Sequence, residues 1–299
     1  MDTQDPDQPF AARQDDDPSA PVGPSLPPEI VYEIFMMAYH KDRNRRTDLL
    51  VVSKLISQWL IPAVYKMVAT GHAAEVNSPS LGVLQRYGHH VKHLLLSGSL
   101  HYPYQSNDGD LIQVCPNVSD LILWHGYNVT HSIKIFDLSL SRLSVHTFST
   151  EFEDQIRSLQ KTEEEKYRSW CSNITHMAWG VVSLTSPELL PSFPNLTHFL
   201  FGEWSIPHAR LQEMLDKVLK NCPGLQVVVV LLGGVQSMSE LSVLDSLDDM
   251  VFDDGRVVVV DGYFVTFWLK GGRGEDDMWT AAERTVRERG TLRGISMSP

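Results

Sequence analysis

Five polar side chains recur at one position of a repeated sequence pattern, and their types could take part in binding chemistry. They are His93, Asp120, Arg142, His176 and His198. Imidazoles titrate near neutral pH, so a surface that carries them is expected to bind in a pH-dependent way. His176 and His198 fall in neighbouring repeats, whose strands should lie about 4.8 Å apart, close enough to share a zinc ion. No third ligand is evident beside them in the sequence, so we predict no metal site.

The chain carries no enzyme motif next to these residues. It lacks a G-x-S-x-G elbow, a phosphate-binding G-x-x-x-x-G-K loop, an H-E-x-x-H helix and a dinucleotide glycine fingerprint. We therefore expect neither catalysis nor a cofactor. A hydrolase or transferase built into the repeats would need convergent polar groups in a pocket, which spacing alone does not reveal.

The elements that position the polar residues are short strands. Apolar triplets recur at offsets 0, +3 and +5, with starts 27, 22, 34, 22 and 29 residues apart. They are Val91/Leu94/Leu96, Val118/Leu121/Leu123, Leu140/Leu143/Val145, Ile174/Met177/Trp179, Leu196/Phe199/Phe201 and Leu225/Val228/Val230. Helical patterns separate the triplets at 108–114, 151–170 and 208–220. This alternation predicts parallel strands that are each buried by their neighbours, as in a solenoid.

Alternation along a strand turns offsets +3 and +5 toward the core and offsets +2, +4 and +6 outward. The outward positions place an apolar column beside the polar one, which is typical of a peptide-binding face. The predicted substrate-binding surface consists of His93, Leu95, Asp120, Ile122, Trp124, Arg142, His176, His198 and Leu200. The alternative is a sheet face that a loop or the N-terminal segment screens.

Composition sets further limits. The 299 residues are 42% hydrophobic and 21% charged, as in a globular protein, and the net charge of -12 disfavours nucleic acid and anionic membranes as partners. Cys115, Cys171 and Cys222 form no C-x-x-C pair and each precedes a repeat strand, which favours a reducing compartment, cytoplasmic or nuclear. Residues 1–25 are rich in Pro and Asp and are expected to be disordered.

Residues 26–70 resemble an F-box. The family's L-P-x-E-I opening matches Leu26, Pro27, Glu29 and Ile30, its helix continues at Ile34, and its central D-L-L...V-C-K stretch matches 48–54, where Ser53 replaces the usual Cys. Many members carry Trp where Ile56 stands. The 59–68 run is similar to the closing segment of fungal F-box proteins. Three short helices are expected, the second beginning at Thr47 or Asp48 and the third at Pro62.

The remainder resembles the leucine-rich-repeat half of F-box proteins, without the asparagine that normally follows each strand, so irregular repeats are expected. The resemblance implies that the helical unit binds a Skp-family adaptor, and through it a cullin-RING ubiquitin ligase, while the repeats select a protein substrate. The implied adaptor-binding residues are Leu26, Pro27, Glu29, Ile30, Ile34 and Val52. The same residues could instead close the helical core, and the chain could be a ligase-independent interaction scaffold with the helical unit as its N-terminal cap.

The predicted fold class is therefore α/β, a three-helix F-box-like unit followed by an irregular leucine-rich-repeat-like solenoid with a largely parallel sheet. The expected organisation is a tail at 1–25, the helical unit at 26–70, the solenoid at 80–267, and a linker, capping helix and tail at 268–299. A seventh strand is expected within 257–267. An amphipathic helix at 278–289 is expected to cover the open end of the stack.

Overall fold

The computed structural model describes residues 26–41, 48–70, 79–97, 108–124, 135–145, 150–180, 187–202, 208–232, 252 and 254–292. The predicted disordered tail at 1–25 lies outside these residues. Contacts divide the chain into two compact units, Met1–Ser57 and Gln58–Pro299. The sequence placed residues 58–70 in the helical unit, whereas the contacts place them in the second unit.

The first unit contains α1 (Pro28–Lys41), η2 (Asp48–Val51) and the beginning of α2 (Lys54–Val64). α1 begins at a proline, whose missing N–H costs nothing in the first turn, and ends in His40 and Lys41, which suit the negative end of the helix dipole. Ser53 stands just before α2, and its Oγ accepts a hydrogen bond of 3.2 Å from the Ile56 amide. Ser53 thus caps this helix.

The prediction of a third helix beginning at Pro62 is wrong. Pro62 lies inside α2, and the chain then forms strand β1 (Met67–Ala69). Val68 and Ala69 pair with Leu94 and Leu95 of the next strand, so the neighbouring strand supplies the backbone hydrogen bonds that a helix would have made internally.

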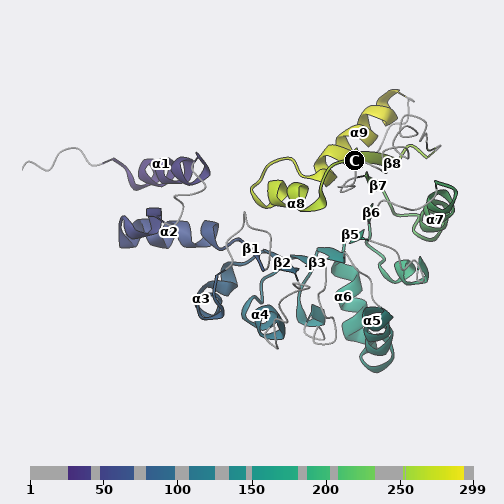
Figure 1. Ribbon diagram of the computed structural model, residues 1–299, viewed down its shortest axis with the longest axis horizontal. Helices are drawn as coiled ribbons and strands as arrows, with labels where there is room; N and C mark the ends of the chain where they lie inside the picture. The colour runs from purple at the N-terminus through teal and green to yellow at the C-terminus, as the bar shows by residue number, and fades with distance from the viewer. Residues whose placement is uncertain are drawn as a thin grey trace, which may run out of the picture. The chain divides into compact units, whose positions relative to one another are not determined.

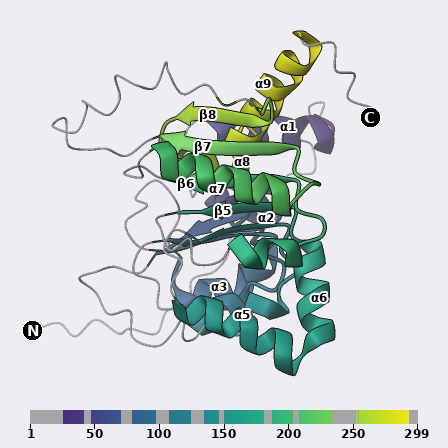
Figure 2. The same ribbon diagram turned by 90° about the vertical axis from the view of Figure 1, so that its right-hand side faces the viewer.

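The second unit is built on one eight-stranded sheet in which every strand is parallel to its neighbours and the order β1 to β8 follows the sequence. The strands after β1 are β2 (His93–Ser97), β3 (Asp120–Trp124), β4 (Arg142–Val145), β5 (His176–Trp179), β6 (His198–Gly202), β7 (Val227–Leu232) and β8 (Val257–Asp261). The α/β class and the parallel sheet are confirmed. In Figure 2, β7 and β8 are seen running in the same direction.

One face of the sheet carries the predicted core. The register aligns Leu94, Leu121, Leu143, Met177, Phe199 and Val228 across six successive strands, and all are buried. The helices on this side are α3 (Leu81–Tyr87), α4 (Asp108–Val114), α5 (Thr150–Thr162), α6 (Glu164–Asn173) and α7 (His208–Asn221) (Figure 1). Two short 3-10 helices, Gly88–His90 and Pro187–Ser192, precede β2 and β6. The helix expected at 151–170 divides at Glu163 into α5 and α6.

The three cysteines are free thiols in this core. Burial raises the pKa of Cys115 to about 12, that of Cys171 to about 12 and that of Cys222 to about 11. The thiols are therefore protonated and unreactive at neutral pH, and they act as small apolar residues at the turns before the strands.

The opposite face is covered by α8 (Phe264–Gly272) and α9 (Met278–Leu292), which lie across the strands from α3–α7 (Figure 1). The linker was expected to begin at residue 268, but residues 268–272 form the end of α8. The strand expected within 257–267 is β8, which ends at Asp261. Helix α9 forms as expected, but it packs on the sheet face through Trp279, Ala282 and Val286 rather than on the end of the stack. With both faces covered, strands such as β7 read as unbroken apolar runs.

Candidate functional site

The predicted polar residues lie side by side on the covered face. The register pairs His93 with Asp120, Asp120 with Arg142, Arg142 with His176, and His176 with His198, so they form one row across β2–β6. This polar row was correctly placed by the sequence pattern. The expectation that the row faces solvent is wrong, because α8 and α9 lie over it and Asp120 and His198 are buried.

The adjoining apolar column is covered as well. Leu95, Ile122 and Leu200 are fully buried, Leu95 and Ile122 in one cluster with Trp268 and Leu200 in another with Trp279. Trp124 stacks on Phe264 of α8 with ring centroids 5.9 Å apart. The helices therefore cover most of this column, and a partner can reach it only where a pocket opens beside Trp124.

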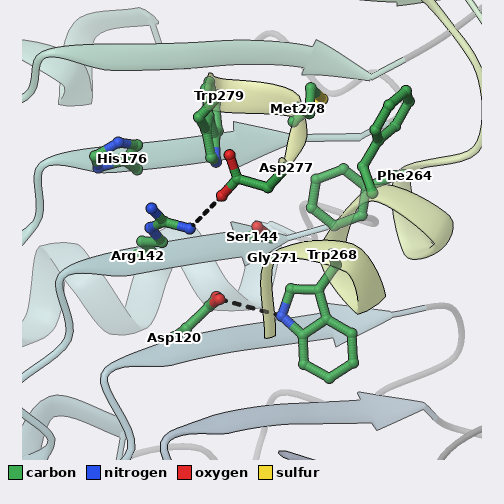
Figure 3. Close-up of a pocket in the computed structure, with 11 residues that line it drawn as sticks. Asp120, Arg142, Ser144, His176, Phe264, Trp268, Gly271, Asp277, Met278 and Trp279 are labelled. Carbon is green, nitrogen blue, oxygen red and sulfur yellow. Dashed lines mark hydrogen bonds and ion pairs between the residues drawn. The ribbon is translucent and has the colours of Figure 1, made fainter. Parts of the chain in front are cut away.

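Side chains from α8 and its connection to α9 satisfy the charges of the row. Asp120 Oδ2 accepts a hydrogen bond from Trp268 Nε1 at 3.2 Å and lies 3.1 Å from His93 Nδ1. Arg142 Nη1 donates to Asp277 Oδ2 at 2.7 Å (Figure 3). A buried charge is expensive without a partner, so these contacts make it possible to close the face over polar groups.

Asp277 has a second role as the N-cap of α9. Its Oδ1 accepts hydrogen bonds of 2.8 Å from both the Thr280 amide and the Thr280 hydroxyl. Burial disfavours its charged form, but the bonds from Thr280 and the guanidinium of Arg142 outweigh burial and lower the pKa of the carboxyl. One carboxylate thus starts α9 and ties it to β4.

The two histidines of the row are stacked, with ring centroids 4.1 Å apart and planes 9° from parallel, and the edge of Trp279 packs against both rings. Burial, the other imidazole and Arg142 lower the pKa of His176 to about 3. Burial also lowers the pKa of His198, against the opposing effect of Glu283, whose Oε1 is 2.9 Å from His198 Nε2. Both rings are therefore neutral at physiological pH.

A ladder of hydroxyl groups runs beside the row, one residue earlier in each strand. Each hydroxyl donates to the backbone carbonyl at the equivalent position of the preceding repeat, at 3.1 to 3.4 Å. The ladder joins Ser119 to Lys92, Ser141 to Ser119, Thr175 to Ser141, and Thr197 to Thr175. It links each of β3–β6 to the strand before it.

Two pockets lie between the sheet and α8. The first is lined by the row and by aromatic residues of α8 and α9 (Figure 3). Its charged residues Asp120, Arg142 and Asp277 are already bonded to protein groups, so it offers a closed polar cluster rather than a free nucleophile and base. The second pocket is almost wholly apolar. Its lining includes Ile122, Trp124, Ala178, Leu200, Leu231 and Phe264.

The adaptor-binding residues expected from the F-box resemblance lie on the surface of the first unit. Leu26, Ile30, Ile34 and Val52 have relative exposures of 57%, 47%, 44% and 54%, and Pro27 and Glu29 are exposed too. The sequence did not point to four further exposed apolar residues of this unit. They are Tyr32, Met37, Val51 and Leu55.

Sequence reasoning also missed the residues that complete the covered face, namely Trp268, Asp277 and Glu283. An Asp three residues before Thr280 at the start of a helix is a capping signal that could have placed Asp277. Glu283 follows Trp279 by one helical turn and so shares its face. Nothing in the local sequence shows that this face packs on β5 and β6.

No protein-family model matches the chain, and no curated protein matches it either. Within the part of the chain that the structure describes, no helix has both the length and the apolar character needed to cross a bilayer.

Proposed function

We propose that the chain is the substrate-recognition subunit of an SCF-type cullin-RING ubiquitin ligase. In this proposal the first unit binds a Skp-family adaptor, and the second unit, here called the repeat unit, binds a protein substrate. The proposal assigns the chain no catalytic role of its own. It rests on the F-box-like sequence of 26–70 combined with one structural observation.

That observation is where the exposed apolar side chains gather. Among the described residues, every large hydrophobic side chain that is exposed lies between 26 and 55, apart from Tyr263. The set is Leu26, Ile30, Tyr32, Ile34, Met37, Val51, Val52 and Leu55. Apolar surface concentrated in this way is costly in water and is typical of a surface that a partner covers. It includes every apolar side chain larger than proline that the F-box resemblance assigns to adaptor binding.

The repeat unit can meet a substrate only where α8 and α9 leave the sheet accessible. The apolar pocket beside Trp124 and Phe264 is such a place, since it opens between the ends of β3–β7 and the start of α8. We propose that an apolar side chain of the substrate packs there, in place of the wider surface that the sequence pattern predicted.

The alternative, a ligase-independent scaffold with an N-terminal cap, has one observation in its favour. The second half of α2 belongs to the repeat unit, and its Leu60 and Val64 are buried. In this alternative, that half of the helix caps the first repeat. The exposed apolar residues before Ser57 are not part of this cap. The two proposals differ in whether these residues bind an adaptor.

One variant with two substitutions distinguishes the two proposals. Leu26→Asp/Ile30→Asp should weaken capture of a purified Skp-family adaptor by at least about tenfold, because it places charges in an apolar contact. Its free energy of unfolding should change little. Glu33→Gln, an exposed change on the same helix, is the control and should retain full binding. Equal capture by wild type and the double variant, or none by either, contradicts the ligase assignment; a large loss of stability favours the cap.

A further inference from the structure

Three potential metal ligands converge at the end of the polar row. Among the described residues, His176 of β5, His198 of β6 and Glu283 of α9 each offer a ligand atom, and these atoms lie within 4.8 Å of one another. The parallel register brings the two histidines together, and the packing of α9 adds the carboxylate from more than eighty residues away.

The hydroxyl ladder orients both imidazoles. Thr175 Oγ1 lies 3.2 Å from the Ser141 carbonyl oxygen and 2.8 Å from His176 Nδ1, so it accepts from that nitrogen when its own proton goes to the carbonyl. Thr197 is related to His198 in the same way. In that arrangement the proton of each neutral ring is on Nδ1, and Nε2 carries the lone pair that a metal ion needs. A hydrogen bond from the second ring nitrogen is the usual support of a histidine ligand.

This tautomer leaves an unsatisfied contact. His198 Nε2 is buried and has no hydrogen-bond partner, although Glu283 Oε1 is 2.9 Å away. With the proton on Nδ1, Nε2 has no hydrogen to donate, and two electron-rich atoms at this distance repel each other. Two ligands of one tetrahedral zinc ion, each about 2.1 Å from it, stand about 3.4 Å apart, so these two atoms would have to separate by about 0.5 Å to hold one. A cation between the atoms would remove the repulsion.

We propose that His176, His198 and Glu283 bind a divalent transition-metal ion, with zinc as the expected metal. Two imidazoles and one carboxylate are ligands that zinc prefers, and a fourth position remains for water. The Glu283 side chain is 41% exposed, which gives the ion a route from solvent. Binding requires the two rings to turn from their parallel stacking so that their Nε2 atoms converge, and the soft second torsion of histidine permits this.

The bound ion would fasten α9 to β5 and β6 and so hold the covered face closed. Arg142, the nearest cation of the row, is paired with Asp277, whose charge offsets the repulsion between the guanidinium and the ion. The site does not depend on adaptor binding, so it can be tested separately from the proposed ligase role.

The test is zinc titration into the full-length, untagged chain after treatment with a chelator. Wild type should bind one equivalent, and its Tm should rise by several degrees when zinc exceeds Kd by roughly 100-fold. Glu283→Gln keeps the shape of its side chain and should weaken binding at least about tenfold, as should His198→Ala. Thr197→Val keeps both histidines but removes one orienting hydroxyl, and should weaken binding about 10- to 100-fold.

His89→Ala/His90→Ala is the matched control, because these neighbouring rings, 3.9 Å apart, are a second histidine pair that could take up metal adventitiously. This variant should bind zinc as wild type does. Visible absorption of bound Co²⁺ should report four-coordination in wild type and disappear in Glu283→Gln. No binding by wild type, or equal binding by wild type and Glu283→Gln, overturns the proposal, as does loss of binding in the control alone.

Discussion

The two units differ in how far they bury their apolar side chains. The repeat unit buries both faces of its sheet, one beneath the helices of the repeats and the other beneath α8 and α9, even though the second face carries a row of polar residues. The first unit leaves most of its large apolar side chains in solvent. A sheet that closes over its own charges satisfies its polar groups within the chain, whereas an uncovered apolar surface on a helical unit is typical of a surface that a partner covers.

The largest effect expected from this difference lies within β3, where neighbouring residues point to opposite faces. Leu121 and Ile122 are both fully buried, Leu121 in the repeat core and Ile122 beneath α8. Leu121→Ala and Ile122→Ala should each lower the free energy of unfolding by about 2–5 kcal/mol, measured by urea denaturation. A cost below about 1 kcal/mol for Ile122→Ala alone would show that the second face is open.

A smaller effect is expected at the junction that closes the second face. Asp277→Ala removes the cap of α9 and the partner of Arg142, and should cost about 1–3 kcal/mol. The neighbouring Asp276 pairs with Arg284 at an exposed site, so Asp276→Ala should cost less than about 0.5 kcal/mol. Equal costs in thermal unfolding would mean that Asp277 does not fasten α9 to the sheet.

The hydroxyl ladder should contribute less at any one position. Ser141→Ala removes one side-chain hydrogen bond between repeats, and a loss of about 0.5–1.5 kcal/mol is expected. Ser172, whose hydroxyl bonds to the nearby Ser169 carbonyl within its own helix turn, provides a control that should be almost neutral when changed to Ala. If both changes are neutral in denaturant, the ladder does not stabilise the stack.

The smallest effect on stability is expected in the first unit. Val51 is the most exposed of its apolar side chains, at 85%, so Val51→Ser should change the free energy of unfolding by no more than about 0.5 kcal/mol. The same change should weaken adaptor capture if Val51 belongs to the docking surface. A stability loss above 1 kcal/mol would mean that Val51 is covered by the chain itself.

The sequence was sufficient to predict the features that recur in each repeat. The spacing of triplets such as Leu121/Leu123 and Phe199/Phe201 predicted the core row, and alternation along each strand predicted the polar row from His93 to His198. Parallel pairing carries both rows across the sheet, because each strand repeats the register of the one before it.

The sequence could not predict what depends on contacts distant in the chain. Phe264–Gly272 is rich in aromatic and β-branched residues and ends in two glycines, so its local preference favours a strand and a linker. It forms a helix because Trp268 and Leu269 bury themselves against Leu95 and Ile122. Local preference also failed at Met67–Ala69, where pairing with β2 decides the structure.

The most direct test of the central claim is hydrogen exchange of the full-length chain with and without a purified Skp-family adaptor. The account predicts slower exchange in peptides from residues 26–57 when the adaptor is present, and unchanged exchange in the strands β2–β8. No added protection anywhere at saturating adaptor, or protection confined to the repeat unit, would contradict the account.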